Sequence, residues 1–255
     1  MSLHVDTIGS GSPLVLIHGW GMHGGVWSDV AQRLFADFSV HSVDLPGFGA
    51  SAPLAKTDLD SLVQSLAVQF ATPVNVCGWS LGGQLAMHWA VQEPAKVNRL
   101  IVVTSTPCFT NRDDWSFGLP SEVLAKFADE LEQNHAATLR RFISLQLRGS
   151  ENERELQTKL REQLFSRGEP DMNALRGGLE ILRDADQRSE VAGIEQQTLV
   201  IAGQRDKLTP PEASHYLAQV IPHARLVVIE GAAHAPFLSH PDIFVEQVSE
   251  FLKSN

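Results

Sequence analysis

The segment GWSLG, residues 78–82, has Ser80 at its centre and lies between a β-branched apolar run and a stretch with helical spacing. A G-x-S-x-G pattern between a strand and a helix is typical of a strained turn that exposes a serine hydroxyl at the edge of a sheet. Strand and helix pass close together there, which favours small residues beside the serine. We predict that Ser80 is a nucleophile; the alternative is a tight turn with an incidental serine.

A serine hydroxyl needs a base to take its proton, and the base needs a carboxylate to fix its tautomer. His234 follows the apolar run RLVVIEG, and Asp206 follows the run TLVIAG, so each lies where a buried strand is expected to end. The order Ser80, Asp206, His234 is the triad order of α/β-hydrolases. We expect these three side chains to meet at one edge of a sheet.

Five other residues fit the roles of base and acid less well. His18 lies in a turn where a structural hydrogen bond is expected, His88 falls inside the helix after the serine, and His240 precedes a helix. Asp184 and Asp186, which do not follow a strand, are the alternative acids. We interpret the three histidines as structural and Asp206 as the better candidate for the acid.

Acyl transfer also needs two donors for the oxygen that becomes negative. One is the backbone N–H after the nucleophile, here that of Leu81, and the other comes from the loop HGWG after an earlier strand. We predict that Trp20 supplies this second N–H. The chemistry would be a two-step acyl transfer that requires no metal and no organic cofactor.

The elements that must position these residues follow from the apolar runs. The runs are continuous, as expected for parallel strands covered by helices on both faces. The predicted fold class is α/β: an α/β-hydrolase fold with a mostly parallel, doubly wound sheet. The expected strands are 13–19, 38–45, 74–80, 99–106, 198–203 and 225–231, with an antiparallel edge strand in 3–8, and the expected helices are 24–36, 58–70, 82–92, 211–220 and 241–253.

The strand pattern is absent from residues 109–186. Two stretches there, 121–147 and 151–165, have helical spacing, and we expect Ser121 to be the N-cap of the first. An insertion between two parallel strands lies above the carboxyl edge of the sheet, where ligands bind. We therefore predict a hydrolase core, residues 1–108 and 187–255, and an inserted helical lid, residues 109–186.

The composition argues against several classes of function. The net charge of −10 disfavours nucleic acid, and no apolar run is long enough to cross a bilayer. The start of the chain lacks the pattern of a signal peptide. Two cysteines, Cys77 and Cys108, are too few for a disulfide framework and have no metal-ligand spacing. We expect a cytoplasmic monomer that binds neither nucleic acid nor a membrane.

Two features of the lid bear on ligands. Six basic and three acidic residues lie between positions 140 and 161, whereas the rest of the chain has 14 basic and 27 acidic residues. This local basic charge suits an acidic partner; the alternative is a solvated helix face. Large apolar residues either line an acyl pocket or form the lid's own core: Phe109, Trp115, Phe117, Phe142 and Leu145. The lid residues expected to contact the substrate are Phe142, Leu145 and Gln146.

Segments spread along the chain closely resemble the pimeloyl-[acyl-carrier protein] methyl ester esterase family of biotin synthesis. They are HGWGMHGGVW, VDLPGFGAS, GWSLGGQLA, TPCF, RGGLEIL and AAHAPFLSHP. The likeness runs nearly end to end and includes the lid. It implies hydrolysis of the methyl ester of a pimeloyl chain attached to acyl carrier protein, with release of methanol.

The resemblance also implies roles for individual residues. Ser80, Asp206 and His234 fall at the family's triad positions, and Trp20 and Leu81 fall at its oxyanion positions. Arg141 and Arg154 match two lid arginines that grip the carrier protein. Two other such positions hold Ala137 and Thr158, which depart from the family pattern, but basic residues stand next to them. The predicted carrier-docking residues are Arg140, Arg141, Arg154 and Lys159.

Three rival functions share much of this pattern. A general short-chain carboxylesterase, or a hydrolase of carbon–carbon bonds, would have the same triad and a different lid. A ligand receptor would keep the fold without the chemistry, because fold alone does not determine function. The complete triad with both oxyanion donors favours an enzyme.

Overall fold

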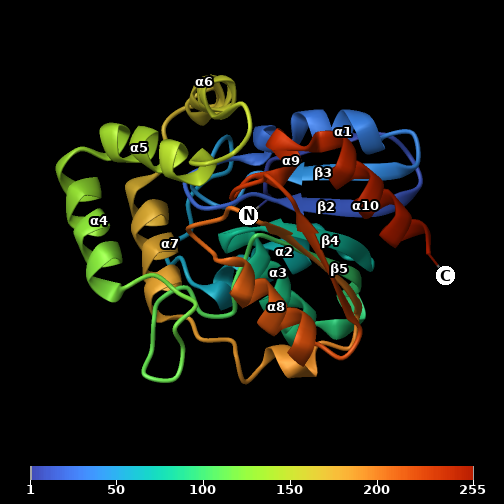
Figure 1. The fold of residues 1–255 in the computed structure, drawn as a ribbon. Helices are drawn as coiled ribbons and strands as arrows, with labels where there is room; N and C mark the ends of the chain where they lie inside the picture. The colour runs from blue at the N-terminus through green and yellow to red at the C-terminus, as the bar shows by residue number, and fades with distance from the viewer. Residues whose placement is uncertain (1, 255) are drawn as a thin grey trace.

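The computed structural model describes residues 2–254, and its centre is a single sheet. The strands are β1 (Val5–Ile8), β2 (Ser12–Ile17), β3 (Phe38–Val43), β4 (Val74–Trp79), β5 (Val97–Val103), β6 (Gln197–Gly203) and β7 (Ala224–Ile229). They are ordered β1-β3-β2-β4-β5-β6-β7 (Figure 1). β1 runs antiparallel to β3 at one edge, and all other neighbours are parallel. The predicted fold class is confirmed.

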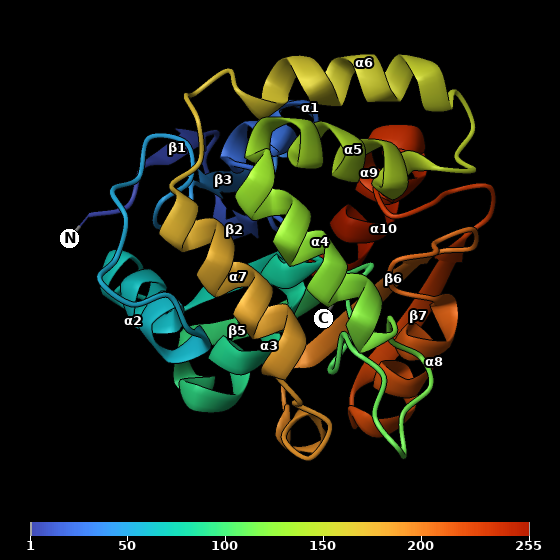
Figure 2. The ribbon, with the colours of Figure 1, turned by 90° about the vertical axis from the view of Figure 1, so that its left-hand side faces the viewer.

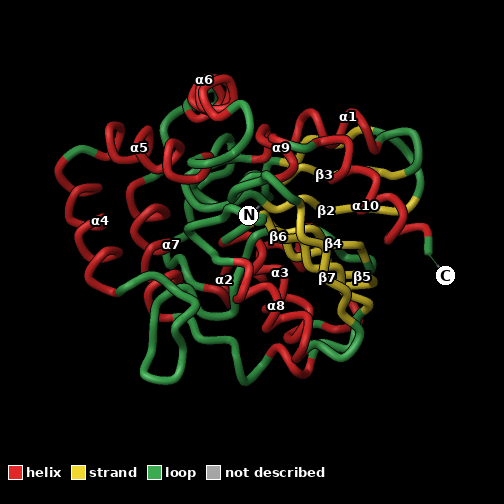
Figure 3. Tube along the Cα trace, in the orientation of Figure 1, coloured by secondary structure: helices red, strands yellow, loops and turns green. Residues whose placement is uncertain are grey.

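Helices cover both faces of this sheet (Figures 1 and 3). One face carries α1 (Ser28–Leu34), α9 (Pro236–Ser239) and α10 (Pro241–Lys253), and the other carries α2 (Leu59–Gln69), α3 (Leu81–Gln92) and α8 (Pro211–Val220). Short 3-10 helices are η1 (Gly24–Trp27), η2 (Pro94–Lys96) and η3 (Val191–Gly193). Because the sheet is covered on both sides, β4 is buried at every position, which explains its continuously apolar sequence.

The expected strands and core helices are present, with ends that differ by a few residues. The stretch expected as one helix over 24–36 divides into η1 and α1. Pro211 and Pro241 are each the first residue of a helix, where the missing N–H of proline costs nothing. Within residues 2–254, no helix is both long enough and apolar enough to cross a membrane.

Between β5 and β6 the chain forms four more helices, which lie over the edge of the sheet (Figure 2). They are α4 (Ser121–Gln133), α5 (His135–Leu147), α6 (Glu153–Leu164) and α7 (Met172–Asp184). The insertion leaves and returns at one place, because Cys108 and Asp186 form an antiparallel bridge there. A Cβ atom on Gly21 would lie 2.9 Å from Leu139 of α5, so the insertion packs on the loop after β2.

The structure corrects two expectations about these helices. Ser121 is not the N-cap of α4; Pro120 occupies that position, and its carbonyl accepts hydrogen bonds from Val123 and Leu124. The helical stretch 121–147 is divided at Asn134, whose side chain accepts a hydrogen bond from Ala137 N and begins a second helix. Proline reaches the extended conformation of an N-cap without a side-chain oxygen, because its φ is already fixed.

Candidate active site

Ser80 lies between the end of β4 and the start of α3, with φ of +56° and ψ of −117°. A residue other than glycine is strained in this region, and such strain persists only where the surroundings enforce it. The Ser80 N–H donates to Val103 O over 3.0 Å, and Ser105 Oγ donates to Ser80 O over 2.7 Å. Val103, at the end of β5, and Ser105 therefore hold the turn in place.

Close backbone contacts explain the glycines around this turn. A Cβ atom on Gly78 would lie 2.1 Å from Gly82 O, and one on Gly82 would lie 2.5 Å from Ile17 O. The turn is thus pressed against the end of β2. A Cβ atom on Gly19 would lie 3.3 Å from Ser80 Cβ, so the loop after β2 is brought beside the serine.

His234 follows β7, and its Nδ1 lies 2.8 Å from Asp206 Oδ2. Three groups hold its backbone. The carbonyl of His234 accepts hydrogen bonds from Trp79 Nε1 (2.7 Å) and Thr104 Oγ1 (2.8 Å). The N–H of His234 donates to Gln146 O of α5 over 3.1 Å. The histidine is therefore positioned by the core on one side and by the insertion on the other.

The Asp206 carboxylate is fixed by its own turn. Oδ1 accepts from the N–H groups of Leu208 (2.8 Å) and Thr209 (3.1 Å), and Oδ2 accepts from Thr209 Oγ1 (2.8 Å). With Nδ1–H of His234 donating to Asp206, Nε2 is left as the acceptor. Nε2 is buried and has no hydrogen-bond partner within residues 2–254. A buried, unpartnered acceptor of this kind is suited to receive a proton.

Two backbone N–H groups next to Ser80 are not engaged. Within the described residues, neither Trp20 N nor Leu81 N donates a hydrogen bond. Leu81 is the first residue of α3, where the helix dipole favours negative charge. The Trp20 side chain is held separately, because its Nε1 donates to Leu175 O of α7 over 2.9 Å. Both N–H groups are therefore free for the oxyanion role predicted for them.

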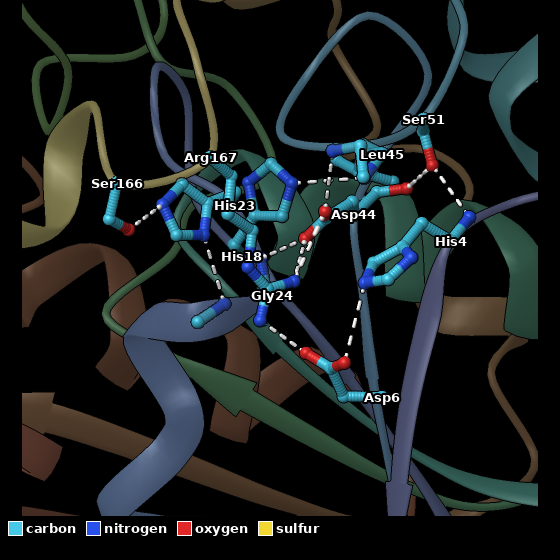
Figure 4. Close-up of polar contacts among 12 residues, drawn as sticks. His4, Asp6, His18, His23, Gly24, Asp44, Leu45, Ser51, Ser166 and Arg167 are labelled. Carbon is cyan, nitrogen blue, oxygen red and sulfur yellow. Dashed lines mark hydrogen bonds and ion pairs between the residues drawn. The ribbon is translucent and has the colours of Figure 1, made fainter.

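A buried polar network lies behind the loop after β2 (Figure 4). His18 Nδ1 lies 2.8 Å from Gly19 O, and His18 Nε2 accepts from Leu45 N over 3.0 Å. Burial lowers the pKa of His18 to about 4, although the hydrogen bond to Gly19 O and the charge of Asp44 oppose this shift. His18 is therefore neutral near pH 7 and makes the structural hydrogen bond expected of it.

Asp44 at the end of β3 ties this network to the insertion (Figure 4). Its buried carboxylate accepts from Gly24 N (2.7 Å), Ala50 N (2.8 Å) and Arg167 Nη1 (3.0 Å). Burial alone would raise the pKa of Asp44. The two backbone N–H groups and the Arg167 guanidinium outweigh burial and hold that pKa below its ordinary value. Arg167 also pairs with Asp6 at the surface.

An apolar cavity of about 720 Å³ lies between the insertion and the carboxyl edge of the sheet. Its volume is typical of a small-molecule site. Phe142 and Leu145 line it, but Gln146 does not; the contact of Gln146 to the site is the one through its backbone carbonyl. The lining residues are Trp20, Phe109, Leu119, Val123, Leu124, Phe127, Phe142, Leu145, Arg148, Gly149, Leu179, Leu182, Gln204, Arg205, Lys207 and Leu208.

Not all of the aromatic residues singled out from the sequence reach this cavity. Phe109 and Phe142 do, and Phe142 packs edge-on against Trp20 with ring centroids 5.1 Å apart. Trp115 and Phe117 instead pack in a small cluster with Cys108. Of the two interpretations, an acyl pocket therefore fits the first pair of aromatic residues and local packing fits the second.

The four basic residues predicted to dock a carrier protein are all exposed, on α5 and α6. Arg140 lies over the ring of Phe165, 5.4 Å from its centroid, and Arg141 pairs with Glu130. The side chains of Arg154 and Lys159 have no hydrogen-bond or ion-pair partner within the described chain. Two of the four are thus partly engaged within the molecule, and two are available to a partner.

The other histidines and aspartates lie away from Ser80 or are paired. His88 Nε2 is 2.7 Å from Asp60, Asp184 pairs with Arg183, and Asp186 pairs with Arg188. The residues that position the site and were not identified from the sequence are Thr104, Ser105, Arg167 and Thr209. Thr209 follows Asp206 at a spacing typical of a side-chain-capped turn, which is a signal that the sequence does contain.

The comparisons with known proteins agree on the fold. A family model described as alpha/beta hydrolase fold matches residues 12–241. An esterase from Exiguobacterium antarcticum superposes with a TM-score of 0.89 at 25% identity, covering 99% of this chain and 96% of that one. A bromoperoxidase from Bacillus anthracis superposes with a TM-score of 0.90 at 21% identity, covering 99% and 95%, and shows the shared fold alone.

Sequence relatives are more specific. The chain is 43% identical over 245 residues to the pimeloyl-[acyl-carrier protein] methyl ester esterase of Nitrosomonas europaea, covering 96% of this chain and 97% of that one. It is 40% identical over 254 residues to the protein of the same name from Chromobacterium violaceum, covering 100% and 99%. The chain belongs to the alpha/beta hydrolase family and, within it, to the family of the pimeloyl-[acyl-carrier protein] methyl ester esterases.

Proposed function

We propose that this protein is a serine carboxylesterase that hydrolyses the methyl ester of pimeloyl-acyl carrier protein, giving pimeloyl-acyl carrier protein and methanol in biotin synthesis. One observation carries the chemistry. Ser80 is held in a strained turn, His234 and Asp206 form a buried hydrogen-bonded pair, the backbone N–H groups of Trp20 and Leu81 are unengaged, and Trp20 lines an apolar cavity. The names of the relatives support the choice of substrate.

In this proposal the reaction has two steps. His234 Nε2 takes the proton of Ser80 Oγ as that oxygen attacks the ester carbonyl, and Trp20 N–H and Leu81 N–H stabilise the oxyanion. The imidazolium, whose Nδ1–H faces Asp206, gives its proton to the departing methanol. His234 then takes a proton from water, the resulting hydroxide attacks the acyl-enzyme carbonyl, and Ser80 leaves with the proton returned by His234.

The cavity and the basic lid residues support the two ends of the proposed substrate. A polymethylene chain gains about 0.8 kcal/mol for each buried methylene group, which suits the apolar cavity wall. Arg140, Arg141, Arg154 and Lys159 would face the acidic carrier protein. Each exposed charge pair contributes only about 0–1 kcal/mol, so several must act together. The same proposal places the protein in the cytoplasm as a monomer.

The test compares hydrolysis of pimeloyl-acyl carrier protein methyl ester with that of a small free methyl ester. We expect the wild type to prefer the carrier-linked ester in kcat/KM, and Arg154→Glu/Lys159→Glu to remove most of that preference. The matched control is Arg225→Glu/Lys253→Glu, which changes the net charge equally at residues remote from the insertion and should preserve the preference. Equal hydrolysis of both esters by the wild type would instead indicate a general carboxylesterase.

A further inference from the structure

The apolar cavity that Trp20 and Phe142 line has charged residues of one sign only. Three of its lining residues are charged, and all three are basic: Arg148, Arg205 and Lys207, here called the cationic rim. Within the described part of the chain, no acidic residue lines the cavity. The whole chain has more acidic than basic residues, with a net charge of −10. A cavity lined by three basic residues and no acidic one is therefore not what this composition alone would give.

The cationic rim joins the two parts of the molecule at the mouth of the cavity. Arg148 directly follows α5, whereas Arg205 and Lys207 flank Asp206 after β6. Arg205 Nη1 donates to Gly149 O over 3.1 Å, so the two sides meet. All three rim residues are exposed.

Exposed apolar side chains lie at the same opening. Val123 and Leu145 line the cavity and are 50% and 37% exposed. The mouth therefore combines an apolar passage with positive charge at its edge. This combination suits a ligand whose apolar chain enters the cavity while an anionic group remains outside.

Two of the rim cations are not neutralised by the protein. Arg141, Arg176 and Arg183 of the insertion each pair with a carboxylate. Arg148 and Lys207, in contrast, have no ion pair and no side-chain hydrogen bond among residues 2–254. Neither side chain is committed to a carboxylate of the protein, so both can bind an anionic ligand.

We propose that the cationic rim binds the phosphate group of the arm on which the acyl chain is carried; this rests on the proposed function. An acyl carrier holds its acyl chain as a thioester at the end of a long arm that begins at a phosphate ester. With the methyl ester at Ser80 and the chain in the cavity, the thioester end leaves through the mouth. Arginine and lysine both bind phosphate, arginine through paired N–H groups and lysine as a point charge.

The experiment omits the carrier protein, so that docking does not contribute. The substrates are the methyl-pimeloyl thioesters of pantetheine and of 4′-phosphopantetheine, which differ only in the phosphate. We expect the wild type to prefer the phosphorylated substrate about tenfold in kcat/KM at low ionic strength, and added salt to weaken that preference. In Arg148→Ala/Lys207→Ala the ratio between the two substrates should approach one.

The matched control removes two other unpaired lid cations, in Arg154→Ala/Lys159→Ala, and should keep the preference for phosphate. A wild-type ratio of one, or a ratio unchanged in Arg148→Ala/Lys207→Ala, overturns the proposal. Monomethyl and dimethyl pimelate give a further check. If the wild type prefers monomethyl pimelate about tenfold in kcat/KM, and Arg148→Ala/Lys207→Ala removes that preference, the proposal is also overturned. The rim would then recognise a carboxylate at the chain end.

Binding to Ser80→Ala separates this proposal from the proposed function, because it needs no turnover. Calorimetry should show the phosphorylated thioester binding about tenfold more tightly than the unphosphorylated one. If the wild type releases methanol from neither substrate but this difference in binding is found, the rim stands and the esterase assignment fails. If the methyl ester of both substrates is hydrolysed and the two bind alike, the esterase stands and the rim proposal fails.

Discussion

The proposed catalytic residues and the basic lid residues are held in opposite ways. Ser80, Asp206 and His234 are 8%, 3% and 1% exposed, and hydrogen bonds from several elements fix them. The four predicted docking residues are exposed: Arg140 lies over an aromatic ring, Arg141 pairs with one carboxylate, and the other two have no ion-pair or side-chain hydrogen-bond partner in the described chain. Reacting groups must be placed to a fraction of an ångström, whereas attraction between charged surfaces acts over longer distances. In the proposed function, bond cleavage and partner selection would thus depend on different residues.

The separation is incomplete, because two contacts join the regions. Gln146 O of α5 accepts the N–H of His234, and Arg167 reaches the buried Asp44 behind the loop after β2. The insertion therefore helps to position the base and the loop that carries Trp20. Changes at these contacts should affect both regions, whereas changes on either side of them should affect one.

The largest effect is expected when the proposed nucleophile, Ser80, is removed. Ser80→Ala should lower kcat about a millionfold for the small methyl ester and for the carrier-linked ester alike, because both would use the same oxygen. Steady-state kinetics on the two esters measure this, and the urea midpoint reports whether the variant is folded. Retained turnover, or a loss confined to one ester, would contradict the assignment of Ser80.

The next test breaks a contact between the regions. Arg167→Gln leaves the buried Asp44 carboxylate without its counter-charge and should lower the free energy of unfolding by about 3 kcal/mol. Arg176→Gln is the matched control, because Arg176 pairs with Glu132 at the surface of the same insertion and should cost under about 1 kcal/mol. Urea unfolding of both variants gives the values. If both variants lost the same free energy of unfolding, the ion pair between Arg167 and Asp44 would stabilise the protein no more than a surface ion pair.

A third test uses pH on the buried polar network around His18, at the loop after β2. The folded-state pKa of His18 is lowered from 6.5 to about 4, so the unfolded chain binds more protons between these values. Stability should therefore fall as the pH drops from 6.5 to 4, by about 3 kcal/mol from this residue. His18→Gln, which can still accept from Leu45 N–H, should lose less stability over that range. Parallel curves for the two proteins would show that His18 does not titrate in this way.

The smallest expected effect lies within the core. Thr209→Val removes the hydroxyl that donates to Asp206 Oδ2 and should lower kcat about tenfold on both esters, as expected for a hydrogen bond to a charged group. Thr209→Ser keeps the hydroxyl and should retain most of the activity. A matching shift in the pH profile of kcat would indicate that Thr209 acts through the His234–Asp206 pair. Equal activity of the two variants would exclude that role.

Sequence reasoning was most successful where the signal is local. Continuous apolar runs predicted the strands, and because parallel strands end at one edge, the runs before Asp206 and His234 were enough to predict that these residues meet. The break at Asn134 was missed, since a single capping residue interrupts an otherwise continuous helical pattern.

Contacts between distant positions were not predictable in this way. Arg167 and Asp44 are 123 positions apart, and neither lies in a motif that points to the other. The cationic rim likewise combines the end of α5 with the loop after β6. Such contacts depend on how the insertion sits on the core, which no local pattern contains.

The antiparallel β-bridge between Cys108 and Asp186 makes the insertion a cassette, that is, a segment whose two ends lie side by side. Because the two ends of the insertion lie side by side there, an insertion whose ends are equally close would leave the register of β5 and β6 unchanged. A transplanted cassette is nonetheless not free in sequence. It must bring a cation to Asp44 and a carbonyl to the N–H of His234, so new substrate preferences can be grafted onto this scaffold only through residues of the insertion that make neither contact.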